Sequence, residues 1–327
     1  MKKNIFITGG CGYKGSKIVP TLLKSGHRIT VFDTTWFGNY LPSNANLSVK
    51  SGDVRNLKNL SLEGYDTVIH LASIANDPCG DLNPTPTWEI SVLATQQLAE
   101  LAISGGVKDF IYASSGSVYG LSDSEKVTEK EKLVPLSIYN KTKMCAERIL
   151  LSYSKALNLK IVRPATVCGL SPRMRLDVAV NMLTVQALQN KKITVLGGEQ
   201  IRPNIHIDDL AALYKFFVEA EESKNGIYNA GFENLKIIEI AEMIAGKTGA
   251  DIQIKESNDP RSYRLCSDKI LEMGFKPQKT VMDAISEISE AWKKGIITNK
   301  PEWHTVSWMQ KNNFGPEKFS PQFALSA

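Results

Sequence analysis

The first 35 residues place a short β-type run, a glycine-rich loop, a helical segment and a second β-type run in that order. Residues 4–8 form the first run, the glycines Gly10, Gly12 and Gly15 follow with G-x-G-x-x-G spacing, and Asp33 ends the second run. Glycines let the backbone approach a pyrophosphate at a helix N-terminus, and a carboxylate at this position accepts hydrogen bonds from ribose hydroxyls. The pattern therefore predicts a dinucleotide-binding βαβ unit.

Apolar runs and helix-period segments alternate along the following part of the chain. The apolar runs are residues 46–50, 67–71, 110–113, 160–162 and 193–196, and the helical segments between them include residues 87–104, 138–156 and 178–189. This alternation predicts an α/β fold of the doubly wound (Rossmann) type, in which helices cover both faces of a parallel sheet. Pro20 falls inside the first helical segment, where we expect a kink or a first-turn position.

The alternation is regular up to about residue 166 and looser beyond it. We expect a dinucleotide-binding domain over residues 1–166 and a smaller α/β substrate cap over residues 167–300, part of which returns to the sheet. The cap should lie over the carboxyl ends of the strands, where ligands bind in open α/β sheets. Residues 301–327 carry aromatic side chains, which we expect to pack on the surface or to bind a partner.

Composition and charge narrow the class of protein. The chain of 327 residues has a net charge of +5 and no basic stripe, so we expect no nucleic-acid partner. No apolar run approaches the roughly 20 residues of a membrane span, and a signal peptide is not expected. The five cysteines and four histidines lack metal-ligand spacing, so we expect reduced thiols, a cytoplasmic location and no metal site.

Tyr139 and Lys143 are four residues apart in a helical segment, so their side chains lie on one face of the helix. A tyrosine hydroxyl has a pKa near 10, and a neighbouring ammonium together with a cationic nicotinamide would lower that value. The pair would then act as a general acid and base. The structural alternative is a lysine that extends past a half-buried tyrosine to reach solvent.

Three motifs together carry a family resemblance: the glycine loop that begins at Thr8, the serine-rich run before Val118-Tyr119-Gly120, and Tyr139-x-x-x-Lys143. With them, the chain resembles the extended short-chain dehydrogenase/reductases, in the branch of NAD-dependent nucleotide-sugar epimerases and dehydratases. The resemblance covers nearly all of residues 3–295. It implies NAD as cofactor, a nucleoside-diphosphate sugar as substrate and a homodimer formed by the helical segments 87–104 and 138–156.

The resemblance also implies roles for individual residues. The catalytic residues would be Ser115, Tyr139 and Lys143. The cofactor would contact Gly9, Gly12, Tyr13, Lys14, Gly15, Asp33, Asp53, Val54, Leu71, Ala72, Ser73, Tyr139 and Lys143. The substrate would contact Ser115, Asn181, Arg202 and Arg261. Because no arginine follows Asp33 to receive a 2′-phosphate, NAD is expected in preference to NADP.

The implied reaction is epimerisation at C4 of the sugar through a transient 4-keto intermediate. A net 4-dehydrogenase or 4-ketoreductase would use the same residues, and a non-catalytic module that senses NAD or a sugar nucleotide is the alternative of another class. Family dehydratases place Asp-Glu directly after the catalytic Ser/Thr, where this chain has Gly116 and Ser117. Thr166 and Cys168 stand where many members have Asn and Tyr, which leaves the sugar open.

Overall fold

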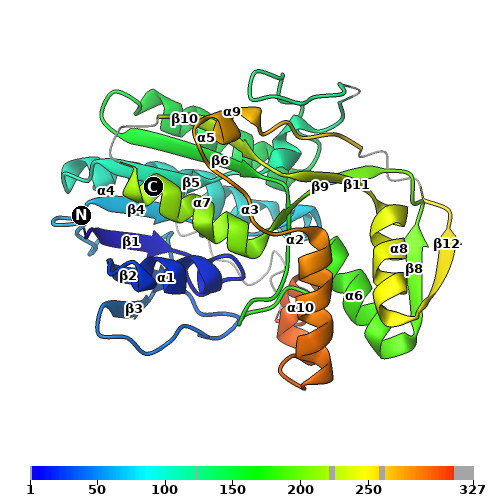
Figure 1. The fold of residues 1–327 in the computed structure, drawn as a ribbon. Coiled ribbons are helices and arrows are strands. Elements are labelled where there is room, and N and C mark those ends of the chain that lie inside the picture. Colours follow the sequence, from blue (N-terminus) through cyan, green and yellow to red (C-terminus); the bar gives the residue numbers. More distant parts are fainter. Residues whose placement is uncertain (1, 123, 221–224, 258–261, 313–327) are drawn as a thin grey trace.

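The computed structural model describes residues 2–122, 124–220, 225–257 and 262–312. Seven parallel strands form the central sheet in the order β10-β6-β5-β4-β1-β2-β3 (Figure 1). They are β1 (Asn4–Thr8), β2 (Arg28–Asp33), β3 (Leu47–Ser51), β4 (Thr67–His70), β5 (Asp109–Ala113), β6 (Asn158–Pro164) and β10 (Gly226–Ala230). The predicted doubly wound fold is thereby confirmed.

Both faces of the sheet are buried because successive strand residues point to opposite sides. In β1, Ile5 and Ile7 join the cluster formed with α1 (Gly15–Lys24) and α7 (Ile207–Glu219). Phe6 joins the opposite cluster, formed with α4 (Ala94–Ser104) and α5 (Ile138–Ser152). These strand side chains are 0% exposed, which accounts for the continuous apolar runs in the sequence.

The smaller cap lies beyond the carboxyl ends of the sheet strands (Figure 1). It contains β7 (Thr166–Cys168), α6 (Ala179–Asn190), β8 (Lys192–Leu196), β9 (Ile201–His206), β11 (Glu233–Lys236), α8 (Ile237–Thr248), β12 (Asp251–Lys255) and α10 (Val281–Lys293). Between these elements the chain returns to the main sheet as α7 and β10, and β10 pairs with β6. The boundary at residue 166 stays a prediction.

Shorter elements connect these layers. They are α2 (Asp77–Leu82), α3 (Pro84–Trp88), the π-helical turn η1 (Glu89–Leu93), the 3₁₀ turns η2 (Gly116–Tyr119) and η3 (Pro301–Trp303), α9 (Asp268–Glu272) and α11 (Thr305–Lys311). The helix expected over residues 87–104 is thus divided among α3, η1 and α4. Among the described residues, none of the helices has both the length and the apolar character needed to cross a bilayer.

The sequence patterns located most of the helices and strands. Of the two alternatives for Pro20, the structure excludes the first-turn position, and the kink stays a prediction. Pro20 lies inside α1 rather than in its first turn. The helix tolerates it beside Ile18 and Val19, which are fully buried against the sheet, because tertiary packing outweighs the loss of one backbone donor.

Candidate functional site

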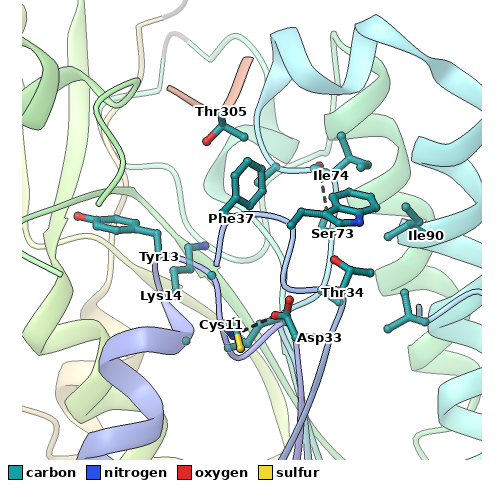
Figure 2. Close-up of a pocket in the computed structure, with 18 of the residues that line it drawn as sticks. Cys11, Tyr13, Lys14, Asp33, Thr34, Phe37, Ser73, Ile74, Ile90 and Thr305 are labelled. Atoms are coloured by element: carbon teal, nitrogen blue, oxygen red, sulfur yellow. Dashed lines mark hydrogen bonds between the residues drawn. The ribbon is translucent and has the colours of Figure 1, made fainter. Parts of the chain in front are cut away.

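A pocket lies at the carboxyl ends of β1, β2 and β4. Among the residues that line it are Gly9, Gly12, Tyr13, Lys14, Gly15, Asp33, Asp53, Val54, Leu71, Ala72, Ser73, Tyr139 and Lys143. All the residues predicted to contact the cofactor therefore surround one cavity, although they come from distant parts of the sequence. Figure 2 shows Tyr13 and Lys14 of the glycine loop on one side of this pocket and Ser73 and Ile74 on the other.

The glycine loop lies so close to its neighbours that side chains would not fit. Gly9 has φ of +72°, and a Cβ atom on it would come within 2.5 Å of the Ala72 amide nitrogen. A Cβ atom on Gly15 would lie 2.3 Å from the Gly10 carbonyl oxygen. The bare backbone at the start of α1 thus forms the wall of a pocket, as a pyrophosphate-binding loop requires.

Asp33 ends β2 with its carboxylate held from both sides. The Cys11 amide donates to Oδ2 at 2.9 Å (dashed in Figure 2), and the Thr35 amide donates to Oδ1 at 2.7 Å. Burial raises the pKa of Asp33, while these amide donors and the nearby Arg173 act in the opposite direction. The carboxylate is oriented, and it suits hydrogen bonding to vicinal ribose hydroxyls.

Asp53 is held differently, by a guanidinium that sequence reasoning did not single out. Arg55 Nη2 donates to Asp53 Oδ2 at 2.7 Å, and Arg55 Nη1 donates to Glu89 Oε2 at 3.1 Å. Glu89 opens the π-helical turn η1, whose next residue, Ile90, lines the pocket. This ion-pair chain therefore fixes the pocket wall around Val54 and Ile90.

The predicted catalytic residues come together at the end of β5 and the start of α5. Lys143 Nζ donates to the Ala113 carbonyl at 2.8 Å and lies 5.9 Å from the centre of the Tyr139 ring. Ser115 lies close enough to Tyr139 to lower its pKa, and the Ser115 hydroxyl forms a hydrogen bond with the Ser117 hydroxyl at 2.7 Å. Helix α5 begins just before Tyr139 because Ser137 caps it, accepting a hydrogen bond from the Asn140 amide at 3.1 Å.

Burial is the main influence on the pKa values of Tyr139 and Lys143. Burial raises the pKa of Tyr139 to about 12, and the nearby Ser115 offsets this effect only in part. Burial, together with the charge of Lys14, lowers the pKa of Lys143 to about 7. The predicted lowering of the Tyr139 pKa by Lys143 together with a cationic nicotinamide stays a prediction, since burial dominates in the polypeptide alone.

Of the residues predicted to bind substrate, Ser115, Asn181 and Arg202 are not part of this lining. Asn181 is fully buried: its Oδ1 accepts from the Gly169 amide, and its Nδ2 donates to the Tyr13 hydroxyl. Arg202 lies on β9, and its Nη1 donates to the Ile201 carbonyl. Arg261 lies outside the described residues. Their substrate roles stay predictions.

The sequence indicated that arginines of the cap, including Arg173 and Arg175, suit a diphosphate. It did not place them, or the C-terminal segment, in the wall of the cofactor pocket. Arg173, Arg175, Thr305 and Met309 all line the pocket, and Phe37 completes this side. The C-terminal segment was expected to pack on the surface or to bind a partner. It contributes instead to the site, and no local pattern in residues 301–311 indicated this.

Cys168 and His206 both form hydrogen bonds within the protein. Cys168 is fully buried, donates its thiol to the Ile205 carbonyl at 3.6 Å and has a pKa raised by burial. His206 is the N-cap of α7, and its Nδ1 accepts a hydrogen bond from the Asp208 amide at 3.1 Å.

His206, Asp208 and Glu287 also approach closely enough to hold a cation, with their ligand atoms within 4.8 Å of one another. Lys17 already binds Asp208 at 2.6 Å, and Lys279 already binds Glu287 at 2.9 Å. Since each carboxylate has an ammonium partner, we interpret this cluster as an ion-pair network that fixes α7 against the glycine-loop helix and α10.

Comparisons with known proteins agree with this geometry. The family model described as "NAD dependent epimerase/dehydratase family" matches residues 5–231. The chain belongs to this family. It is 27% identical over 312 residues to a UDP-glucose 4-epimerase from Corynebacterium glutamicum, covering 88% of this chain and 94% of that protein.

Solved structures of the family are similar in fold. MoeE5 in complex with UDP-glucuronic acid and NAD has a TM-score of 0.81 at 26% identity, covering 90% of this chain and 100% of that chain. The UDP-glucuronic acid 4-epimerase from Bacillus cereus, in complex with UDP-glucuronic acid and NAD, has a TM-score of 0.78 at 26% identity, with coverages of 89% and 99%.

Proposed function

We propose that the protein catalyses NAD-dependent epimerisation at C4 of a nucleoside-diphosphate sugar. The observation that carries this proposal is that Tyr139 and Lys143 line a pocket built from a glycine loop and Asp33, with Ser115 next to Tyr139. Family membership and the names of the related epimerases support the same reaction.

The pocket fits NAD. The glycine loop would receive the pyrophosphate, Asp33 the adenosine ribose, Val54 the adenine, and Lys143 the nicotinamide ribose. When bound, NAD supplies a hydride acceptor that can return the hydride to the other face of the sugar. The positive charge of the nicotinamide also opposes the burial effect that raises the pKa of Tyr139.

The polypeptide's own part of the chemistry is proton transfer. Tyr139 removes the proton of the C4 hydroxyl and later returns it, while Ser115 donates a hydrogen bond to the same oxygen as the carbonyl develops. Lys143, fixed on the Ala113 carbonyl, holds a positive charge beside the phenolate. The keto sugar turns over in the cap before the proton is returned.

The substrate diphosphate would lie against the cap. Arg202 on β9 and Arg261 are the guanidinium groups proposed to bind it, and Asn181 acts through Gly169 and Tyr13. Since the related epimerases carry UDP-sugars in their names, UDP-sugars are the first substrates to test. We further propose a cytoplasmic homodimer.

The experiment is incubation of the purified protein with NAD and a panel of UDP-hexoses, UDP-pentoses and UDP-uronic acids. The expected result is a product of unchanged mass with altered NMR couplings at C4. Loss of two hydrogens with accumulation of reduced cofactor would identify a 4-dehydrogenase instead. Binding of NAD and UDP-sugar without any turnover would support a sensing module.

A further inference from the structure

Arg173 is the buried arginine whose charge lacks a carboxylate partner in the described part of the chain. It is 2% exposed, like Arg163, which binds Glu147 through two guanidinium nitrogens. Arg55, which is 9% exposed, binds Asp53 and Glu89. A buried charge without a counter-ion is costly, so a protein that retains one has a reason to do so.

The hydrogen bonds of Arg173 use only part of its guanidinium. Nη2 donates to the Thr305 hydroxyl at 3.2 Å and to the Glu302 carbonyl at 3.4 Å, and both acceptors are neutral. Nε has no partner among the described residues, although it is buried. Because a guanidinium presents a planar fork of donors, the unused donor points to a ligand with anionic oxygens.

Arg173 belongs to the cofactor side of the pocket. Its guanidinium carbon lies 4.2 Å from the centre of the Phe37 ring, which follows Asp33 on the loop after β2. Its charge opposes the effect of burial, which raises the pKa of Asp33, the predicted ribose ligand. The predicted substrate ligand Arg202 does not line this cavity, whereas Arg173 does.

The C-terminal segment holds this guanidinium in place. Thr305 begins α11 and lies on the opposite side of Phe37 from Asp33 in Figure 2. Trp308 packs on Phe37 with ring centres 4.6 Å apart, and Met309 lines the pocket. Residues in the segment 302–309 therefore contact the stacked Arg173 and Phe37 side chains, although this segment lies outside the Rossmann domain.

We propose that Arg173 binds the pyrophosphate of NAD and that α11 holds its guanidinium in the binding orientation. This inference rests on NAD being the cofactor, as in the proposed function. Arg173 and the glycine loop line the same pocket, so the anionic oxygens would be held between the loop amides and the guanidinium fork. The C-terminal segment thereby becomes part of the cofactor site.

The test is calorimetric titration of protein freed of nucleotide, comparing wild type with Arg173→Met, Thr305→Val and the exposed-arginine control Arg28→Met. Hydrogen bonds to charged groups predict that Arg173→Met weakens NAD and ADP by about tenfold or more and leaves adenosine unchanged. Thr305→Val should weaken NAD less, and should have no further effect when combined with Arg173→Met. Arg28→Met should bind like wild type.

Several results would overturn the role of Arg173. Equal NAD and ADP affinities in wild type and Arg173→Met would do so, as would an equal loss for adenosine. If Arg173→Met loses affinity only for UDP, Arg173 binds the substrate. If it loses affinity only for NADP, Arg173 binds a 2′-phosphate. If Arg173→Met does not fold, the test rests on Thr305→Val. An unchanged affinity for NAD and an unchanged dissociation rate in that variant would refute the proposal that α11 orients Arg173. Wild type that binds no NAD would instead contradict the proposed function itself.

Discussion

At the scale of single residues, Tyr139 carries the largest predicted effect on activity. Tyr139→Phe removes one hydroxyl from a side chain that is 9% exposed, so the fold and NAD binding should persist. Turnover should fall by about 10²- to 10⁴-fold, the usual contribution of a positioned acid or base. Steady-state assays on the identified sugar nucleotide measure this, and Tyr153→Phe, on an exposed tyrosine hydroxyl, is the matched control. Near-normal turnover of Tyr139→Phe would refute the mechanism.

Lys143 makes stability depend on pH. Its pKa is about 7 in the folded protein, below the unfolded value near 10.4, so the unfolded chain binds more protons between these values. Stability from this group therefore rises with pH over that window. Lys143→Met should be more stable than wild type at pH 7, by a margin that shrinks by up to about 1.4 kcal/mol per pH unit toward pH 9. Urea unfolding of nucleotide-free protein at both pH values checks this, and a constant margin would contradict it.

Asp33 should select NAD over NADP. Its carboxylate is fixed by two backbone amides and would lie beside the 2′-phosphate of NADP, which it repels. Calorimetry should show much weaker binding of NADP than of NAD. In Asp33→Asn the difference between the two dissociation constants should be smaller. The structure brings Arg173 near Asp33, which the local sequence did not reveal. Comparable dissociation constants for the two cofactors in wild type would show that Arg173 outweighs the carboxylate.

At the scale of elements, the turn after β5 limits the chemistry. Ser115 is the N-cap of η2, and Ser117 within this turn donates its hydroxyl to the Asn140 side chain. Gly116 and Ser117 carry no group that protonates a leaving hydroxyl or takes a C5 proton near neutral pH. We therefore expect no 4,6-dehydration, and product mass spectrometry should show no loss of water. Detection of a product lighter by one water would place an acid and a base elsewhere in the cap.

At the scale of the whole molecule, exposed apolar side chains support the proposed homodimer. Leu98 and Leu150 are fully buried in the core, whereas Leu93 on η1 is 39% exposed and Leu151 on α5 is 38% exposed. Leu93→Glu should therefore shift the protein toward monomer, because a charge would be buried in the interface. Leu271→Glu, on α9 and equally exposed at 39%, is the control that should stay dimeric. Light scattering at micromolar concentration decides, and a monomeric wild type would reject the dimer.

The sequence by itself determined the features that rest on short-range geometry. Strand residues alternate between faces and helix residues recur every three or four positions, so the runs around Ile5 and Phe110 were readable from their patterns. The glycine loop was readable because only glycine fits where a Cβ atom on Gly15 would meet the Gly10 carbonyl. Tyr139 and Lys143 share a helix face for the same local reason.

Tertiary structure alone decided what joins distant segments. Arg173 meets Thr305 across 132 residues, and β10 completes the sheet only after the chain has passed through part of the cap. The pKa of Tyr139 depends on burial, which is set by packing and not by its helical partner. Such contacts have no period along the chain, because their free energy comes from desolvation and side-chain pairing between elements that the folded core brings together.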